Sequence, residues 1–390
     1  MYSLRSHSCS RIGIVHEGNF GDIIAILPMA GILKAALPNC TTVFIGRRYG
    51  REIALASHHI DEFLDADAVR EDTAALAAAQ LDILLNPFPY RTIARTAARA
   101  RIPVRVGNLR RGAYARWCNR FVAYGRAKSG LHEAVLNLRE LRALGVYAPS
   151  LTGKDMPGLC GLVRLQPLSP EVRALFATNH FHLLLHTKSN MNGREWPLAH
   201  FLALAEALQP YPVQIFLTGT AQEGEVVRAE CPALIGRPEV VDTFGRFSTG
   251  ELLSFIGAAD GVIGAGTGPV HIAAALGKHA LGIYPPLKSI SAKRWSPLGP
   301  NGEALQAGTS CPAPCKWHED CRCMKAITPQ LVADRVVHWM AQAKIAPNGD
   351  RSVGKRRLRN LPADIDAGHW SEAPRELGTE GEGEVVTPPQ

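Results

Sequence analysis

The sequence lacks any run of eighteen apolar residues, about the shortest length from which a membrane-spanning helix can form. Its first twenty residues also lack the unbroken apolar segment and small-residue cleavage site of a secretory signal. We therefore expect an intracellular, cytoplasmic protein. Hydrophobic residues make up 46% of the 390 positions and charged residues 20%, a balance typical of folded domains.

The chain also lacks the cysteine pattern of a secreted, disulfide-bonded domain. It has nine cysteines, an odd number, and five of them are scattered singly, so we expect reduced thiols. The other four are Cys311, Cys315, Cys321 and Cys323, with His318 among them. Only the first pair has the spacing of a zinc-finger pair, and a C-x-C pair is awkward for a tetrahedral ion. We therefore assign no metal.

Acidic residues are missing between Ile83 and His132, a segment that contains eleven Arg or Lys. The positive charge of this segment alone exceeds the net charge of the whole chain, which is +8. Most charge runs are solvated faces, but the complete lack of acids favours an anionic partner. The chain has no zinc-finger, RNA-recognition or helix-turn-helix pattern, so nucleic acid is not expected. A phosphorylated or carboxylated glycolipid at a membrane surface fits the charge.

Short apolar runs alternate with helical patterns through most of the chain. The runs predict strands at 11–15, 41–46, 81–86, 102–107, 180–186, 212–219, 260–266 and 279–284. Apolar residues at helical spacing predict helices at 23–37, 197–208, 250–259, 269–277 and 331–343. Such alternation is typical of parallel sheets with helices on both faces.

The alternation is interrupted once, at the Gly- and Pro-containing stretch 145–161, and then begins again. We therefore predict two Rossmann-like α/β domains, residues 1–160 and 161–346. Residues 347–390 are first basic and then acidic, with few large apolar side chains. Because such a segment cannot bury enough surface to fold, we expect a disordered tail.

Three loops that connect a predicted strand to a helix are candidates for function, because open α/β sheets bind ligands at the carboxyl ends of their strands. The first is 17–22, EGNFGD, in which two glycines allow a sharp turn before Asp22. From these residues alone, Asp22 is best explained as a cap that interacts with the positive end of the following helix.

The second loop, from His186 to Pro197, is polar for eight residues and enters a helix that begins with proline. Its hydroxyls, amides and two cations suit a phosphate bound near a helix N-terminus. A solvated loop anchored by Trp196 explains the same pattern equally well.

The third loop, from Gly264 to His271, combines three glycines with a threonine and a proline that favour a helix start. Its backbone amides could hold a diphosphate. A dinucleotide fingerprint would need glycine at position 269, which is Pro269, so an NAD-dependent dehydrogenase is disfavoured. His271 lies one turn inside the helix, where a packed core histidine is the simplest interpretation.

Five segments, in this order and spacing, resemble family 9 glycosyltransferases, the group that contains the ADP-heptose:lipopolysaccharide heptosyltransferases. They are 18–39, 192–208, 215–223, 266–277 and 321–332, and the resemblance extends over about residues 11–340. It implies a GT-B architecture, in which two Rossmann-like domains face each other across a cleft. The N-terminal domain would bind the acceptor and the C-terminal domain the nucleotide sugar.

The resemblance also implies roles for single residues. Asp22 takes the position of the catalytic base, which replaces the cap-only interpretation, although one carboxylate can do both. Arg194 stands in place of a lysine that meets the donor phosphates, and Glu223 in place of an acid near the donor ribose. The full expected donor set is Ser189, Asn190, Arg194, Glu223, Gly266, Thr267, Gly268 and His271, and the expected acceptor set is Asn19, Arg91, Arg95, Arg110 and Arg111.

One position departs from the family pattern. Gly266 stands where members usually have an aspartate, so the acidic contact is missing and the identity of the donor is open. The predicted function is an inverting glycosyltransferase that moves a sugar, with heptose from ADP-heptose as first candidate, onto an anionic glycolipid or glycan such as the lipopolysaccharide core. The enzyme would work in the cytoplasm, with peripheral contact at the inner face of the inner membrane as an option.

Beyond the nucleotide-sugar co-substrate no obligatory cofactor is expected, and the need for a divalent metal is open. Two alternatives remain from the sequence. One is a family 9 transferase with another nucleotide sugar, and the other is a non-catalytic protein that binds sugar nucleotides or glycans.

Overall fold

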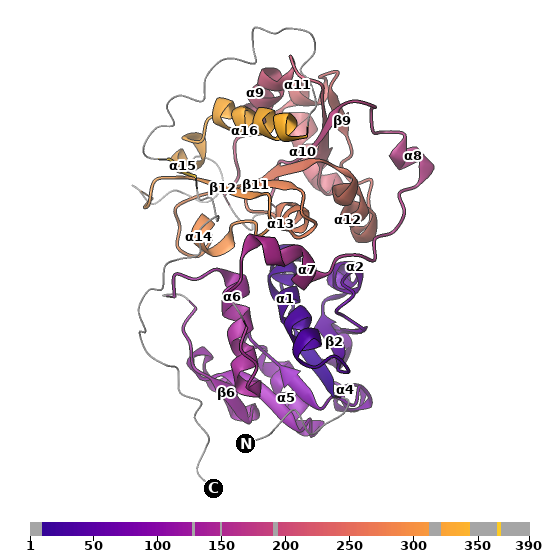
Figure 1. Cartoon of the computed structure of the whole chain (residues 1–390), viewed down its shortest axis with the longest axis vertical. Helices are drawn as coiled ribbons and strands as arrows, with labels where there is room; N and C mark the ends of the chain where they lie inside the picture. Colours follow the sequence, from indigo (N-terminus) through magenta and orange to yellow (C-terminus); the bar gives the residue numbers. More distant parts are fainter. Residues whose placement is uncertain are drawn as a thin grey trace. The chain divides into compact units, whose positions relative to one another are not determined.

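A computed structural model describes residues 10–126, 129–148, 150–189, 194–311, 321–343 and 365–367. The chain forms two compact units that divide between Arg164 and Leu165. Each unit is built around its own β-sheet, and Figure 1 labels many of the helices and some of the strands.

The sheet of the first unit is parallel, with strand order β3-β2-β1-β4-β5-β6. Its strands are β1 (Arg11–Val15), β2 (Thr41–Gly46), β3 (Glu62–Asp65), β4 (Ile83–Leu85), β5 (Val104–Asn108) and β6 (Arg120–Val122). Strand β1 is central, and Ile14 pairs with Phe44 on one side and Leu85 on the other. This is the strand order of a Rossmann fold, and it reverses between β1 and β4. Open α/β sheets bind ligands at that reversal point.

Helices connect these strands and cover the sheet (Figure 1). They are α1 (Phe20–Ala36), η2 (Arg48–Gly50), α2 (Arg51–Ala56), α3 (Ala66–Val69), α4 (Thr73–Ala78), α5 (Arg91–Arg99), η3 (Leu109–Arg111), η4 (Ala113–Trp117), α6 (Glu133–Leu138), η5 (Arg139–Leu144), η6 (Gly153–Asp155) and α7 (Met156–Cys160). Apolar side chains of α4 and α5, including Leu76 and Ile93, pack on Val43 and Leu84 of the sheet. Helix α1 packs instead against α6 and α7.

Helix α1 contains Pro28, which has no N–H to donate to the carbonyl of Ile24 one turn earlier. The Cys160 thiol donates to this carbonyl across 3.8 Å, and Asn137 Nδ2 donates to the neighbouring Ala25 carbonyl across 3.1 Å. Gly31 lets α7 approach closely, because a Cβ at this position would lie 2.5 Å from the Leu159 carbonyl oxygen. Backbone carbonyls of α1 therefore accept hydrogen bonds from side chains of α6 and α7.

The sheet of the second unit has the order β13-β12-β11-β10-β7-β8-β9. Its strands are β7 (Phe181–His186), β8 (Val213–Thr218), β9 (Val240–Asp242), β10 (Gly261–Gly264), β11 (His279–Tyr284), β12 (Gly302–Ala307) and β13 (Ile365–Ala367). All neighbours pair in parallel except β13, which is antiparallel to β12. The parallel part repeats the Rossmann order, with its reversal between β7 and β10.

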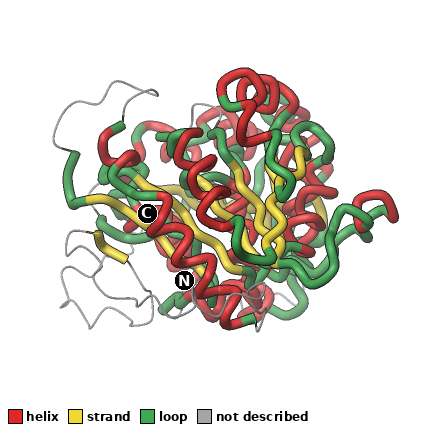
Figure 2. Tube along the Cα trace, turned by 90° about the horizontal axis from the view of Figure 1, so that it is seen from above, coloured by secondary structure: helices red, strands yellow, loops and turns green. Residues whose placement is uncertain are grey.

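The helices of this unit flank the strands, which are yellow between red helices in Figure 2. They are α8 (Pro170–Arg173), α9 (Leu198–Leu208), α10 (Ala221–Glu230), α11 (Pro232–Ile235), α12 (Thr249–Ala258), α13 (Gly268–Ala275), α14 (Ala292–Trp295), α15 (Arg322–Lys325) and α16 (Pro329–Gln342). Helices α9 and α16 pack side by side over a core that includes Trp196 and Trp339.

The predicted fold class, two Rossmann-like α/β domains, is confirmed, and every predicted strand is present within a few residues. Inside the predicted disordered tail, Ile365–Ala367 form β13 by pairing with β12, so that prediction is wrong for these three residues. Residues 344–364 and 368–390 lie outside the described residues. No helix in the described part is long and apolar enough to cross a membrane.

Candidate active site

The loop after β1 lies at the reversal point of the first sheet, and side chains accept its successive backbone N–H groups. These bonds are Glu17 N–H to Tyr90 Oη (3.0 Å), Gly18 N–H to His16 Nδ1 (2.9 Å) and Asn19 N–H to Asp22 Oδ2 (2.9 Å). The Tyr49 hydroxyl also donates to the Gly18 carbonyl. The loop is therefore held in one conformation by side chains from three parts of the chain.

Asp22 is half-buried in the first turn of α1, where its carboxylate caps the helix through the Asn19 amide. Burial raises the pKa of the Tyr49 phenol, the nearby Arg47 opposes this, and the negative charge of Asp22 adds to it. A carboxylate held in this way, on the helix that follows the central strand, can accept a proton from a bound hydroxyl.

His16, which directly follows β1, is 2% exposed. Burial, with a smaller contribution from the positive charge of Arg126, lowers its pKa to about 3. Its ring meets Phe88 edge-on, with 4.6 Å between ring centres, and Tyr90 at 6.2 Å. His16 is not among the predicted site residues, although a histidine directly after an apolar strand is a visible signal.

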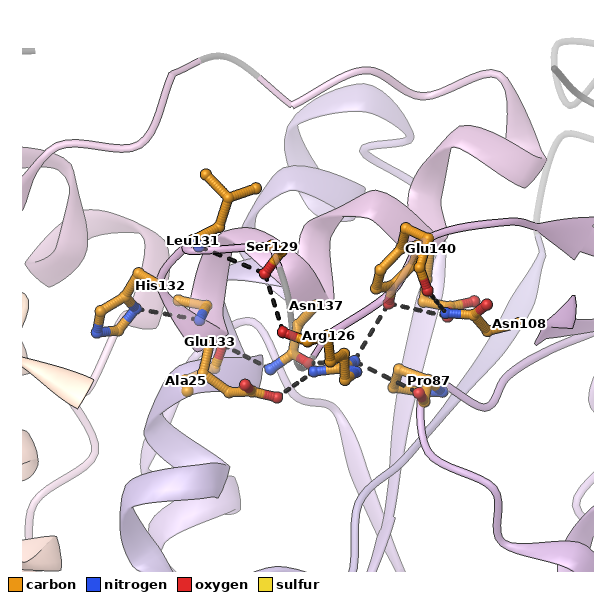
Figure 3. Close-up of polar contacts among 12 residues, drawn as sticks. Ala25, Pro87, Asn108, Arg126, Ser129, Leu131, His132, Glu133, Asn137 and Glu140 are labelled. Atoms are coloured by element: carbon orange, nitrogen blue, oxygen red, sulfur yellow. Dashed lines mark hydrogen bonds and ion pairs between the residues drawn. The ribbon is translucent and has the colours of Figure 1, made fainter. Parts of the chain in front are cut away.

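Arg126 is also buried, and Figure 3 shows the polar groups around it. It forms an ion pair with Glu133 and donates to Asn137 Oδ1 (2.9 Å) and Tyr124 Oη (3.2 Å). The Tyr124 hydroxyl donates in turn to Glu140 Oε1 across 3.1 Å. Burial raises the pKa of Glu140 to about 7, against the opposing effects of Arg126 and the Tyr124 hydrogen bond.

The predicted acceptor residues follow strands β1, β4 and β5, whose carboxyl ends share one edge of the sheet. Asn19 is the exposed cap of α1, Arg91 is exposed at the start of α5, and Arg110 is exposed in η3 after β5. Arg95 is half-buried one turn into α5, and its Nε has no hydrogen-bond partner among the described residues. The side chain of Arg111 lies outside the described part of the structure.

In the second unit, Glu195 holds the two sides of the loop after β7 together. It forms a 2.7 Å ion pair with Lys188 and accepts from the Ser189 N–H (2.9 Å) and hydroxyl (3.3 Å). Trp196 anchors the same loop by donating to the Ile327 carbonyl across 2.8 Å. Arg194 is 6% exposed, and Asn190 lies outside the described residues.

The loop after β10 contains Gly266 in the left-handed region, with φ of +60°, followed by Thr267 and then Gly268 at the start of α13. Thr267 is 8% exposed, and its hydroxyl has no hydrogen-bond partner in the described part of the chain. The same is true of Thr187, 1% exposed, which follows the adjacent strand β7. The Thr187 hydroxyl belongs to the loop predicted to suit a phosphate, but Thr187 is not in the expected donor set.

Glu223 and His271 have clear structural roles. Glu223 Oε2 accepts from the N–H (2.7 Å) and hydroxyl (3.0 Å) of Thr220 and so caps α10. Burial lowers the pKa of His186, at the end of β7, and Glu223 opposes this shift, which indicates that the two groups are near each other. His271 is 5% exposed in α13, with its ring 6.2 Å from that of Trp295, as expected for a packed histidine.

Of the predicted cysteine cluster, Cys321 and Cys323 are buried and Cys311 is half-buried. Within the described ranges, no group of three or more His, Cys, Asp or Glu has the arrangement of a metal site. Cys315 and His318 lie outside those ranges.

Comparisons with known proteins agree with this architecture. The model of glycosyltransferase family 9 (heptosyltransferase) matches residues 94–325, more than half of the chain. No curated protein matches the sequence. The E. coli ADP-heptose LPS heptosyltransferase II superposes with a TM-score of 0.66 at 16% identity, over 86% of this chain and 99% of that one.

Two further solved structures have the same fold. A family 9 glycosyltransferase from Veillonella parvula gives a TM-score of 0.67 at 16% identity, over 85% of this chain and 97% of that one. The E. coli heptosyltransferase WaaC with ADP gives 0.63 at 15% identity, over 84% and 99%. This chain belongs to glycosyltransferase family 9 and is a glycosyltransferase with the GT-B fold of the heptosyltransferases.

Proposed function

We propose that this glycosyltransferase transfers a sugar from a nucleoside-diphosphate donor to a hydroxyl of an anionic glycolipid or glycan, with inversion at the anomeric carbon. The observation that carries the proposal is the Asp22 carboxylate, anchored by the Asn19 amide at the reversal point of the first sheet. A protein that only binds glycans has no need of such a base.

In the proposed reaction, Asp22 accepts the proton of the acceptor hydroxyl while that oxygen attacks the anomeric carbon. The bond between the anomeric carbon and the donor diphosphate breaks, and the nucleoside diphosphate leaves with the bonding electrons. A general base of this kind contributes roughly 10²–10⁴-fold to a rate.

The leaving diphosphate gains negative charge, and several groups of the second unit suit it. Arg194 supplies a guanidinium, Ser189 a hydroxyl, and the start of α13 the backbone N–H groups of Thr267 and Gly268. The two buried threonine hydroxyls, at 187 and 267, add donors from adjacent loops. Such fixed donors are commonly worth about 3 kcal/mol each to a transition state.

Solved structures of the same fold suggest which donor to test first. The E. coli heptosyltransferase WaaC has been solved with ADP and with ADP-2-deoxy-2-fluoro heptose, so ADP-heptose is the first donor to test. Gly266 brings no acid to the donor, which makes other nucleotide sugars necessary members of the panel.

The acceptor is proposed to be anionic because Arg91, Arg95, Arg110 and Arg111 follow strands at the same edge of the first sheet as Asp22. Between Ile83 and His132 the sequence offers no acid to neutralise them. Phosphates or carboxylates of a lipopolysaccharide core would meet this charge, and anionic lipid at the inner membrane surface would add to the attraction.

We propose that no metal or other cofactor is obligatory, since Arg194 and the helix N-terminus supply the positive potential that a divalent ion would otherwise provide. Activity that persists in EDTA would support this point, and activity that requires added Mg²⁺ would contradict it.

A nucleotide-sugar panel tests the main proposal. Thermal shift would identify the donor that stabilises the protein, and product analysis with a lipopolysaccharide-core acceptor would follow for native protein and Asp22→Ala. The proposal expects stabilisation of both proteins and transfer only by the native one. Stabilisation without transfer by either would favour the sugar-nucleotide-binding alternative.

A further inference from the structure

We propose that His16 is a positioning residue for Asp22: its imidazole holds the Gly18 amide and thereby fixes the loop that carries the carboxylate. The inference rests on the proposed role of Asp22 as the base. What is new is the role of the hydrogen bond between His16 and Gly18, which keeps Asp22 in position for sugar transfer.

The hydrogen bond defines the state of the ring. The Gly18 N–H donates to Nδ1 across 2.9 Å, so Nδ1 carries no proton and the neutral ring has its proton on Nε2. Among the described residues, Nε2 has no hydrogen-bond partner. Within the described residues, Nδ1 is thus the ring nitrogen that forms a hydrogen bond. Removal of the ring would break this bond to Gly18 and no other side-chain hydrogen bond of His16 there.

Gly18 lies close to both the His16 ring and the Asp22 carboxylate. A Cβ built on Gly18 would lie 2.5 Å from His16 Cε1 and 2.6 Å from Asp22 Cγ. The imidazole and the carboxylate therefore border the same small space, which a glycine leaves open. Asp22 Oδ2 accepts from the next amide, that of Asn19, so a shift of Gly18 moves the anchor of the carboxylate directly.

Aromatic packing fixes the ring itself. Phe88 meets it edge-on, with 4.6 Å between the ring centres. The guanidinium of Arg126 lies 4.2 Å from the centre of the same Phe88 ring and also forms the polar contacts of Figure 3. Tyr90, which also meets the ring, accepts from the Glu17 N–H. Tyr90 therefore contacts both the His16 ring and Glu17, the next residue of the loop.

Burial and the charge of Arg126 keep the pKa of His16 far below neutrality, which agrees with a permanent acceptor for the Gly18 amide. A protonated ring would carry a proton on Nδ1 and could no longer accept this bond. The ring is therefore suited to hold the loop and unsuited to exchange protons with a substrate near neutral pH.

Three substitutions separate the hydrogen bond from the bulk of the ring. His16→Asn places an amide oxygen near the position of Nδ1, His16→Gln places its amide near Nε2, and His16→Ala removes both. We expect His16→Asn to keep kcat within about threefold of native, and the other two to lower kcat by about 10–100-fold, because small displacements of a catalytic group are costly. KM for the donor should change little.

Amide hydrogen exchange over residues 16–22 gives a readout that does not depend on turnover. Gly18 should exchange at least about tenfold faster in His16→Ala and His16→Gln than in native protein or His16→Asn. Unchanged exchange in His16→Ala, or equal loss of kcat in the Asn and Ala variants, would overturn the inference. Absence of transfer by native protein would contradict the proposed function instead, while the exchange data would still decide whether His16 holds the loop.

Discussion

The ring of Tyr284 lies against Gly266, so closely that a Cβ built on Gly266 would come within 2.7 Å of Tyr284 Cε1. Gly282 meets the same ring, with 2.4 Å from its built Cβ to Tyr284 Cε2. The Tyr284 hydroxyl donates to the carbonyl of Trp295, which fixes the ring from its far end. The absence of a side chain at position 266 therefore leaves room for the Tyr284 ring on the neighbouring strand.

This relationship predicts that a side chain at position 266 destabilises the second unit. Gly266 has φ of +60°, so Gly266→Ala should add backbone strain to the clash with Tyr284 and cost about 1–3 kcal/mol. The melting temperature should fall by several degrees. Gly158→Ala is the matched control, because a Cβ at Gly158 meets nothing within 4 Å, and it should leave the melting temperature nearly unchanged.

A double variant locates the cause of that loss. If the clash with the ring dominates, Gly266→Ala should cost clearly less in a Tyr284→Leu background than alone. Equal costs in the two backgrounds would assign the loss to backbone strain and would contradict the proposed fit between residue and ring.

Asp22→Asn should separate the base from the helix cap. The amide oxygen of asparagine can still accept from Asn19 N–H, so the melting temperature should stay close to native. Loss of the base should lower kcat by about 10²–10⁴-fold. Glu251→Gln changes a carboxylate with the same capping role in α12, where Glu251 Oε2 accepts from Ser248 N–H across 2.8 Å, and it should leave kcat unchanged. Native kcat in Asp22→Asn would remove Asp22 from the mechanism.

The central strands of both sheets could be predicted because burial on both faces leaves a continuous apolar run, as in β1 and β7. The edge strand β3 reads EFLD, is exposed or half-buried throughout and has no such run. Strand β6, at the opposite edge, has three residues, RFV, and is too short to form an apolar run.

Likewise, only part of the candidate site could be predicted from the sequence. Local spacing was enough to place Asp22 at the start of a helix and the glycines of the loop after β10. The bond from Glu17 to Tyr90 spans 73 positions, and no local pattern reports such a contact. The same holds for Arg126, whose position beside Phe88 is set by the sheet order rather than by neighbours in the sequence.

Arg194 should matter for donor affinity more than for folding. Arg194→Met keeps much of the side-chain bulk but removes the guanidinium, and loss of a charge-assisted contact to phosphate should weaken nucleotide-sugar binding by about 10–100-fold. Isothermal titration with the best donor of the panel would measure the change. Arg173→Met, at an exposed position of α8, is the control and should bind as native does. Equal affinity in the two variants would exclude Arg194 from the donor site.

Glu140 should make the stability of the protein depend on pH in a defined direction. Burial raises its pKa from the ordinary value near 4.5 to about 7, so between these values the folded chain holds a proton that the unfolded chain releases. The free energy of unfolding should therefore fall as pH rises through this window and stay lower above it. The buried His16 has the opposite effect, because its pKa is lowered to about 3 and its contribution is lost as pH falls.

Glu140→Gln isolates the first effect, because the His16 contribution is common to both proteins and cancels in the difference. Glutamine keeps an acceptor for the Tyr124 hydroxyl but does not titrate. Urea unfolding at pH 5, 6, 7 and 8 should show the variant gaining stability relative to native as pH rises, by up to about 3 kcal/mol. Glu230→Gln, an exposed carboxylate at the end of α10, should show no such trend. A difference between Glu140→Gln and native that is constant with pH would mean that Glu140 is ionised in the folded protein throughout this range, and that Arg126 stabilises both carboxylates of the network.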